Sequence, residues 1–294
     1  MEGMQIKEKA IKQKIEPRKE LLKLGAYLIV IYLLLFALLY SPLYKAIILR
    51  PDGGTSQLYE IDKILDAKRE EYFFESGGNK LHGWLFRKPG SDIVVLIHHG
   101  NAGNLLNRLF LAKAFIQAGT SVFLYDYRGY GKSTGATSLN GIIDDGLAAF
   151  DFVKTQFHFP IVFNYGESIG SGVACAVNSK RNANGLILQS GIVSLPKVAK
   201  DGVFFLNVFP DNLWPNPRLN NYAAVSQTRT PLLLLHGVQD KIVPISQSEA
   251  LLSGAASPDK LLVSLPNCGH NDVGDQDAQL FQSTIAAFVQ KHRQ

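Results

Sequence analysis

The feature that most restricts the fold of this chain is a repeated alternation of two kinds of apolar run from residue 72 onward. Short, continuously apolar runs such as Ile93–His99 and Pro231–Gly237 have the length of strands. Between them lie longer amphipathic runs such as Asn104–Gly119, which have the length and spacing of helices. Strands that are apolar on both faces are typical of a parallel sheet covered by helices on both sides. The sequence therefore predicts an α/β fold.

The same pattern assigns individual elements along the chain. The predicted strands are 81–86, 93–99, 121–127, 161–166, 185–191, 231–237 and 261–266. The predicted helices are 104–119, 139–157, 171–180 and 277–292. We find no internal repeat and no low-complexity segment.

A second apolar run, Leu24–Tyr44, holds 21 residues without a charge. About 20 apolar residues in a helix cross the hydrocarbon core of a bilayer. The run is longer than the apolar region of a signal peptide, no small-residue cleavage site follows it, and a buried core helix would show a polar stripe. We therefore predict an uncleaved transmembrane helix at 24–44.

Charge around this run predicts its orientation. Residues 1–23 hold seven Lys or Arg and four Glu, whereas few basic residues follow the run. The positive-inside rule then places 1–23 in the cytoplasm and the rest of the chain across the membrane, in the periplasm if the source is bacterial. We expect a linker at 45–71 and one folded domain at 72–294.

The remaining charge and the cysteines exclude other classes of protein. The net charge is +5, of which the N-terminal segment carries +3, so no basic face for nucleic acid is expected. Two cysteines, Cys175 and Cys268, are too few for a disulfide scaffold and lack zinc-site spacing. We predict no metal site and no cofactor, and the sequence does not decide whether the two cysteines pair.

The segment 192–228 interrupts the alternation. It carries four prolines and a cluster of aromatic residues. Long insertions between sheet strands often cover a site, so we predict a short lid whose candidate residues are Phe204, Phe205, Phe209 and Trp214.

Ser168 lies in a G-x-S-x-G pattern between Gly166 and Gly170. A predicted strand precedes the pattern and a predicted helix follows it, which is the context of a nucleophile elbow. The glycines leave room at a sharp turn that exposes the serine hydroxyl. We therefore predict Ser168 as the nucleophile.

A serine hydroxyl needs a base, and the chain offers His270 after the last predicted strand. Asp240 follows the strand before it. The order Ser168, Asp240, His270 is that of an α/β-hydrolase triad, and each residue lies beyond the carboxyl end of a predicted strand. Asp272 is the rival acid, but it is only two residues from His270.

An acyl-transfer site also needs donors for the oxyanion. The loop His98–Asn104 follows a strand and opens a helix, so it can aim a backbone N–H at the site. We assign this role to the N–H groups of Asn101 and Ile169, and expect His98 and His99 to have structural roles.

The segment Asp126–Gly135 contains GKST, which resembles the end of a phosphate-binding loop. That motif needs a glycine five residues before Gly131, where this chain has Asp126. We therefore exclude nucleotide binding and expect a glycine-rich turn held by an Asp126–Arg128 contact.

Together, HHGNAGN, DYRGYGKSTG, GESIGSG, LLHGVQDKIVP and GHND resemble the α/β-hydrolase superfamily. They most resemble its membrane-anchored serine hydrolases related to prolyl oligopeptidase, including lysophospholipase-like and depalmitoylase-like members. The resemblance covers about residues 72–292. It implies an eight-stranded, mostly parallel sheet and the same site residues. Cys268 departs from the pattern, because a small apolar residue is usual beside the base.

The sequence thus predicts a serine hydrolase that cleaves an acyl ester, a thioester or a lysophospholipid. A serine peptidase or aminopeptidase is the alternative, and acyl transfer to another acceptor is also open. A hydrolase-like scaffold without turnover is a remote third interpretation, against which the complete triad argues. The substrate and the oligomeric state are not predicted.

Overall fold

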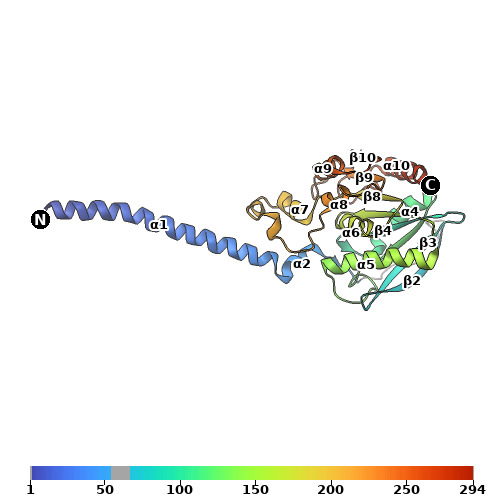
Figure 1. Cartoon of the computed structure of the whole chain (residues 1–294), viewed down its shortest axis with the longest axis horizontal. Coiled ribbons are helices and arrows are strands. Elements are labelled where there is room, and N and C mark those ends of the chain that lie inside the picture. The colour runs from blue at the N-terminus through green and yellow to red at the C-terminus, as the bar shows by residue number, and fades with distance from the viewer. Residues whose placement is uncertain (1, 54–66, 294) are drawn as a thin grey trace. The chain divides into compact units, whose positions relative to one another are not determined.

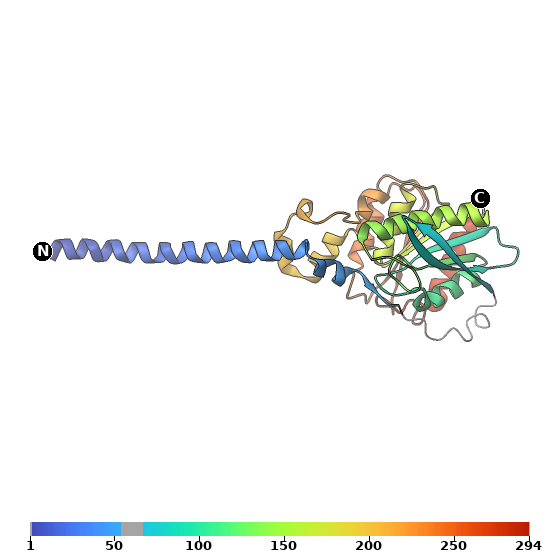
Figure 2. The same cartoon turned by 90° about the horizontal axis from the view of Figure 1, so that it is seen from below.

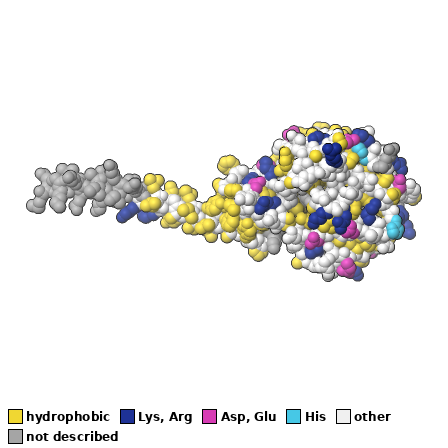
Figure 3. All heavy atoms as spheres, in the orientation of Figure 1, with side chains coloured by type: hydrophobic (Ala, Val, Ile, Leu, Met, Phe, Trp, Pro, Cys, Tyr) yellow, Lys and Arg dark blue, Asp and Glu magenta, His cyan; other side chains and the backbone are white. Residues whose placement is uncertain are grey.

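The computed structural model describes residues 2–53 and 67–293, and the chain divides into two compact units, Met1–Ile47 and Ile48–Gln294 (Figure 1). The first unit is mainly the helix α1 (Glu2–Leu39). Within it, the most apolar 18-residue window of Lys19–Leu39 has a mean hydropathy of 2.4 and is not buried. Hydrophobic side chains cover this part of the helix in Figure 3. It is long and apolar enough to cross a membrane.

The helix ends five residues earlier than predicted, at Leu39 rather than Tyr44. The Ser41 hydroxyl donates to the Leu38 carbonyl, and Pro42 begins a new helix, α2 (Pro42–Ile48). Proline has no N–H to continue a helical ladder, but it fits the first position of a helix. The local sequence around Ser41 and Pro42 therefore explains the break.

The second unit, which we call the C-terminal unit, is built on an eight-stranded sheet among the described residues, in the order β10-β9-β8-β7-β4-β6-β3-β2. Strands β4, β6, β7, β8, β9 and β10 pair in parallel, whereas β2 and β3 are antiparallel to their neighbours. This confirms the predicted α/β-hydrolase sheet. The strands are β2 Lys68–Ser76, β3 Asn79–Arg87, β4 Ile93–His98, β6 Ser121–Tyr125, β7 Ile161–Glu167, β8 Gly185–Gln189, β9 Leu232–Gly237 and β10 Lys260–Leu265.

The segment predicted as a linker, 45–71, contributes to this unit. A short strand, β1 (Arg50–Pro51), pairs in parallel with β5 (Ala102–Gly103), and β2 already begins at Lys68. Residues 54–66 lie outside the described residues.

Helices cover both faces of the sheet (Figures 1 and 2). Side chains of α4 and α10 join one core cluster with Ile187 and Leu233, and those of α6, α8 and α9 join another with Leu186 and Leu232. Successive strand residues therefore point into different cores, which explains the continuous apolar runs. The helices are α4 Leu109–Gln117, α5 Leu139–Phe152, α6 Ile169–Asn178, α8 Asn221–Val225, α9 Ser246–Gly254 and α10 Ala278–Lys291, with η1 Leu105–Arg108 before α4 and η2 Val153–Phe157 after α5.

The predicted insertion lies between β8 and β9 and projects from the body of the C-terminal unit in both views (Figures 1 and 2). It contains α7 (Leu195–Gly202), η3 (Phe204–Val208), η4 (Asp211–Leu213) and α8. Its four aromatic candidates divide into two pairs. Phe209 and Trp214 are buried, whereas Phe204 and Phe205 are exposed. The lid role of these residues stays a prediction.

Candidate active site

Ser168 occupies a sharp turn between β7 and α6. Its backbone has φ 54° and ψ −117°, a conformation that is strained for any residue with a side chain. A Cβ atom at Gly166 would lie 2.4 Å from the Gly170 carbonyl oxygen, and one at Gly170 would lie 2.1 Å from the His98 carbonyl oxygen. The two flanking glycines are therefore sterically required for this turn.

The structure brings Ser168, His270 and Asp240 into one chain of hydrogen bonds. The Ser168 hydroxyl lies 3.1 Å from Nε2 of His270, and Nδ1 of His270 lies 2.6 Å from Oδ2 of Asp240. With the proton on Nδ1, the ring donates to the carboxylate and Nε2 can accept from the serine. This arrangement can draw the proton from Ser168 when its oxygen attacks a carbonyl carbon.

The rival acid has a different role. Oδ1 of Asp272 accepts from the Gly269 N–H at 2.7 Å, so this carboxylate supports the loop that presents His270. Asp240, and not Asp272, faces the histidine ring.

Asp240 is held as a carboxylate by several donors. Its Oδ1 accepts from the N–H groups of Ile242 and Val243, and Nε2 of His236 lies 3.4 Å from Oδ2. Burial alone would raise the pKa of Asp240, but the hydrogen bonds from His236, His270 and Val243 outweigh it and hold this pKa below its usual range. Asp240 is therefore ionised and oriented at neutral pH.

Two backbone N–H groups at this edge of the sheet have no hydrogen-bond acceptor among the described residues. They belong to Asn101, after β4, and to Ile169, the first residue of α6. The carbonyl of Asn101 is fixed from two sides, since it accepts from the Arg50 N–H at 2.9 Å and from the Tyr130 hydroxyl at 2.8 Å. The peptide groups around Asn101 are thus held by elements distant in sequence.

A buried ion pair, which the sequence did not predict, connects the Ser168 turn to the Asn101 loop. Nε and Nη2 of Arg108 each lie 2.9 Å from a different oxygen of Glu167, the residue before Ser168. Nη1 of Arg108 also donates to the Ala102 carbonyl. A Cβ atom at Gly100 would lie within 3.0 Å of both charged side chains. Glu167 within G-x-S-x-G was the available sequence signal, but nothing in the sequence named its partner.

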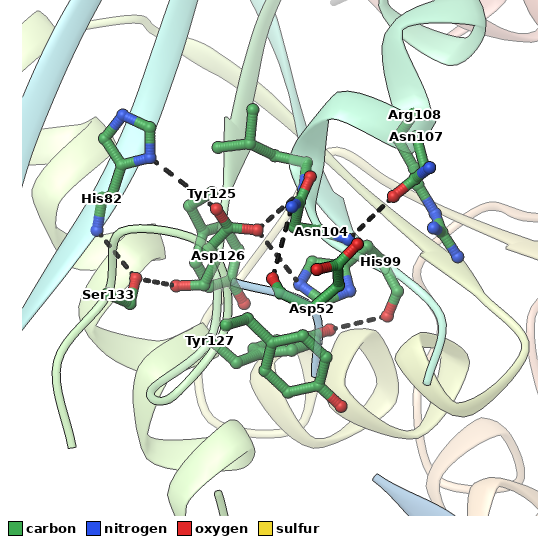
Figure 4. A network of polar contacts seen from close by, with 12 residues as sticks. Asp52, His82, His99, Asn104, Asn107, Arg108, Tyr125, Asp126, Tyr127 and Ser133 are labelled. Carbon is green, nitrogen blue, oxygen red and sulfur yellow. Dashed lines mark hydrogen bonds and ion pairs between the residues drawn. The ribbon is translucent and has the colours of Figure 1, made fainter. Parts of the chain in front are cut away.

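Asp126 lies at the centre of a second polar cluster (Figure 4). Its Oδ1 accepts from the Leu105 N–H at 2.7 Å, and its backbone carbonyl accepts from the Ser133 hydroxyl. Nδ1 of His82 and Nε2 of His99 lie 3.7 and 3.8 Å from its carboxylate. Burial raises the pKa of Asp126 against the smaller effect of these neighbours. Ser133 of the GKST segment therefore helps to fix a turn.

The expected contact between Asp126 and Arg128 is wrong. Arg128 binds Asp145 instead, with its backbone N–H, Nε and Nη2 all donating to that carboxylate at 2.7 to 3.1 Å. Asp145 is buried on α5, so Arg128 joins the glycine-rich turn to that helix. A charge 17 positions away satisfies the guanidinium better than one two positions away.

His98 and His99 have the expected structural contacts. His98 bonds to the Tyr125 hydroxyl and lies near Asn164, and Nδ1 of His99 donates to the Gly100 carbonyl. Burial lowers the pKa of both imidazoles to about 3, so they are neutral. Cys175 and Cys268 are both free and buried. Within residues 2–53 and 67–293, no group of three or more His, Cys, Asp or Glu could hold a metal ion.

Sequence comparison finds a matching protein family and several similar proteins. The sequence model of the family described as "Serine aminopeptidase, S33" matches residues 90–229 and 220–277. An uncharacterized protein of Mycobacterium tuberculosis is 34% identical over 230 residues, covering 77% of this chain and 80% of that protein. Protein bem46 of Schizosaccharomyces pombe is 33% identical over 212 residues, covering 67% of this chain and 69% of that protein.

Solved structures share the fold at lower identity. An esterase of Pyrococcus furiosus superposes with a TM-score of 0.70 at 19% identity, covering 83% of this chain and 98% of that one. Est1E of Butyrivibrio proteoclasticus, solved with ferulic acid bound, gives a TM-score of 0.63 at 21% identity, covering 75% and 98%.

Proposed function

Because the chain belongs to the serine aminopeptidase S33 family of α/β hydrolases, we propose that it hydrolyses acyl esters or thioesters through an acyl-enzyme on Ser168. The observation that carries this proposal is the unbroken chain from Asp240 through His270 to Ser168, with separations of 2.6 and 3.1 Å. His270 acts as the base, Asp240 orients it, and the nucleophile is Ser168.

In the first half of the reaction, the Ser168 oxygen bonds to the acyl carbon while its proton passes to Nε2 of His270. The carbonyl oxygen becomes an oxyanion and accepts hydrogen bonds from the N–H groups of Asn101 and Ile169. The imidazolium then gives its proton to the leaving alkoxide or thiolate, and the bond to the leaving group breaks.

The second half repeats these steps with water. His270 takes a proton from a water molecule, whose oxygen bonds to the acyl carbon. The bond to Ser168 breaks, the serine recovers its proton from His270, and the carboxylic acid leaves.

Labelling with a fluorophosphonate tests the nucleophile directly, because the probe modifies only an activated serine. Wild type and Ser253→Ala, which changes an exposed serine on α9, are expected to label equally. Ser168→Ala is expected not to label. Absence of labelling in the wild type, or equal labelling of Ser168→Ala, would favour a scaffold without turnover.

The leaving group is a separate question. Solved neighbours with the same fold are described as esterases, whereas the family description names an aminopeptidase. Water-soluble p-nitrophenyl esters compared with aminoacyl and prolyl p-nitroanilides separate the two activities. We expect kcat/KM for the esters to be higher, and preference for an anilide would establish the peptidase alternative.

The apolar part of α1 supports a further part of the proposal, that the protein is held in a membrane by the helical residues after Lys23, with residues 1–23 cytoplasmic and the C-terminal unit across the bilayer. The support is the apolar, unburied surface of this helix and the basic residues before it. Retention of the protein in membranes at alkaline pH and an intact-mass measurement test it. A shortened mature chain would identify a cleaved signal peptide instead, and proteolysis from each side of sealed membranes tests the orientation.

A further inference from the structure

An exposed apolar surface lies at the start of η3, and we call it the apolar tip. It consists of Val203, Phe204, Phe205 and Val208, whose exposed fractions are 36, 88, 54 and 57%. Single exposed apolar residues are ordinary, but four within six positions form a contiguous patch. Figure 3 shows hydrophobic side chains on the insertion, with charged ones beside them.

The tip is exposed although the insertion has a core of its own. Phe209 and Trp214 are buried, and the indole N–H donates to the Phe209 carbonyl. The Asn207 side chain donates to the Phe204 carbonyl and fixes the 3₁₀ turn. The segment therefore buries some aromatic residues and presents others outward on an ordered turn.

The tip and the start of the C-terminal unit share one edge of the sheet. The insertion begins after the carboxyl end of β8, and β1 pairs with β5 after the carboxyl end of β4. Strands β4, β7, β8 and β9 are parallel, so these carboxyl ends lie at the same edge. Ser168 follows the carboxyl end of β7. The chain thus enters the unit at the edge that carries the insertion and the candidate active site.

The chain between α1 and the C-terminal unit is short. Eight residues, 40–47, separate the end of α1 from Ile48. Even fully extended they span about 30 Å, so a bilayer that holds α1 stays within that reach of the entry edge.

We propose that the apolar tip docks into the interfacial region of the bilayer that holds α1 and directs the Ser168 edge toward lipid acyl substrates. This inference rests on the membrane anchoring proposed for Lys19–Leu39. The occupant is lipid because the anchored unit meets this one bilayer continuously at high local concentration. Exposed phenylalanines on a turn are the kind of group that buries at the boundary between headgroups and acyl chains.

The charges near the tip indicate which lipid it needs. Between Leu195 and Trp214 the charged residues are two lysines and two aspartates. They pair as Lys197 with Asp201 and Lys200 with Asp211. No net positive charge remains in this segment to attract anionic headgroups, so docking is driven by apolar burial and occurs equally on neutral phosphatidylcholine.

Depth-dependent quenching tests the contact in the full-length protein. Phe204→Cys is labelled with an environment-sensitive fluorophore and reconstituted into phosphatidylcholine vesicles with nitroxide-labelled lipid. Cys175 and Cys268 are buried, so they do not compete for the label. The matched control is Lys180→Cys, an exposed position after α6, which runs away from the entry edge.

We expect quenching of about twofold or more at position 204 by nitroxides near the headgroups, and none at position 180. The same label in a Phe205→Ser/Val208→Ser background should lose this quenching. Addition of an anionic lipid should not increase it. Absence of quenching at 204 while the protein floats with the vesicles overturns docking alone, as does cross-linking of the tip to a second copy. Failure to float overturns both anchoring and docking.

Activity gives a second measure. In Phe204→Ser/Phe205→Ser, the ratio of hydrolysis of a long-chain ester in vesicles to hydrolysis of a soluble short ester is expected to fall about tenfold. An unchanged ratio overturns the role of the tip in substrate access. If no ester is hydrolysed by the wild type, the proposed function fails, while the quenching measurement still decides docking.

Discussion

The surroundings of Asp240 and Asp126 differ, although both are buried aspartates with two histidines nearby. At Asp240, Nδ1 of His270 lies 2.6 Å from the carboxylate and backbone N–H groups supply further bonds. At Asp126, the histidine nitrogens lie 3.7 and 3.8 Å away and one backbone N–H is bound. The pKa of Asp240 is lowered, because these bonds outweigh burial, and that of Asp126 is raised by burial.

The comparison shows that an aspartate beside a histidine is not by itself a catalytic pair. Short, aligned donors keep a carboxylate charged inside a protein, and without enough of them burial favours the neutral acid. Access differs as well, since the His270 side chain is 10% exposed and that of His99 is 0% exposed. Of the two, the Asp240 cluster, which consists of Asp240, His270 and Ser168, therefore fits the proposed proton transfer to a substrate.

The largest effect is expected from a substitution that breaks the Asp240 cluster. His270→Ala should lower kcat/KM for an ester by roughly 10³- to 10⁶-fold, because Ser168 loses its base. The variant should still fold, because the N–H groups of Ile242 and Val243 continue to bind the Asp240 carboxylate. The comparable change in the other cluster, His82→Ala, should lower kcat/KM by less than about tenfold. Equal losses of kcat/KM in the two variants would show that the two clusters do not differ in their contribution to the reaction.

The next largest effect is a loss of stability, expected at the ion pair between Arg108 and Glu167. Arg108→Met should lower the free energy of unfolding by about 3–5 kcal/mol, because it leaves Glu167 buried without its partner. The double variant Arg108→Met/Glu167→Leu should be more stable than Arg108→Met. Urea unfolding of the two variants measures the difference, and a double variant no more stable than Arg108→Met would show that the Glu167 charge does not depend on its partner.

Acid should destabilise the fold through buried histidines. The pKa of His98 and of His99 is lowered from 6.5 to about 3, so between these values the unfolded chain binds protons that the folded protein does not. Stability is therefore full above pH 6.5 and falls as the pH drops, by about 2 kcal/mol for each histidine at pH 5. Asp240 adds a loss only at lower pH, since its pKa is held below the usual range.

Denaturant unfolding at pH 7 and pH 5 measures this change. In His99→Asn the difference between the two pH values should be about half that of the wild type. The same stability at both pH values would show that these histidines are not held neutral.

A smaller loss of stability is expected at Asp126. Asp126→Ala removes the acceptor of the Leu105 N–H and should lower the free energy of unfolding by about 1–3 kcal/mol. The exposed change Asp275→Ala should stay within about 0.5 kcal/mol of the wild type. A large loss of kcat in folded Asp126→Ala would instead give this cluster a part in the reaction.

The smallest expected effect lies between the clusters, at the Asn101 loop. Tyr130→Phe removes the hydroxyl that donates to the Asn101 carbonyl. A loss of about 1 kcal/mol of transition-state stabilisation corresponds to a roughly fivefold lower kcat with little change in KM. Tyr222→Phe, at an exposed tyrosine, is the control. A rise in KM with unchanged kcat would place Tyr130 in substrate binding.

The sequence predicted the sheet and the members of the Asp240 cluster for the same reason. In a parallel sheet the carboxyl ends of strands meet at one edge, so motifs at strand ends are brought together by topology alone. Ser168, Asp240 and His270 each follow such a strand. Their order along the chain was therefore sufficient to expect contact.

Other features depended on partners far away in sequence. Arg108 binds Glu167, which is 59 positions away in the sequence. Arg128 binds Asp145 and not Asp126, which is nearer in the sequence. The edge strand β2 was missed because its first four residues are charged and only the three residues 72–74 are apolar, which is too short a run to predict a strand. Within the insertion, the sequence did not show that Phe209 is buried while Phe204 is exposed.

The hydrogen bond from the Arg50 N–H to the Asn101 carbonyl distinguishes shortened forms of the protein that keep the support of the Asn101 loop from forms that lose it. Cleavage among residues 40–47 would release a C-terminal unit that keeps β1 and its bond to the Asn101 loop. Removal of everything up to Pro51 would leave the eight strands of the large sheet and Ser168, Asp240 and His270 in the chain. That shorter form would lack the backbone partner of Asn101, so its activity would underestimate that of the whole chain.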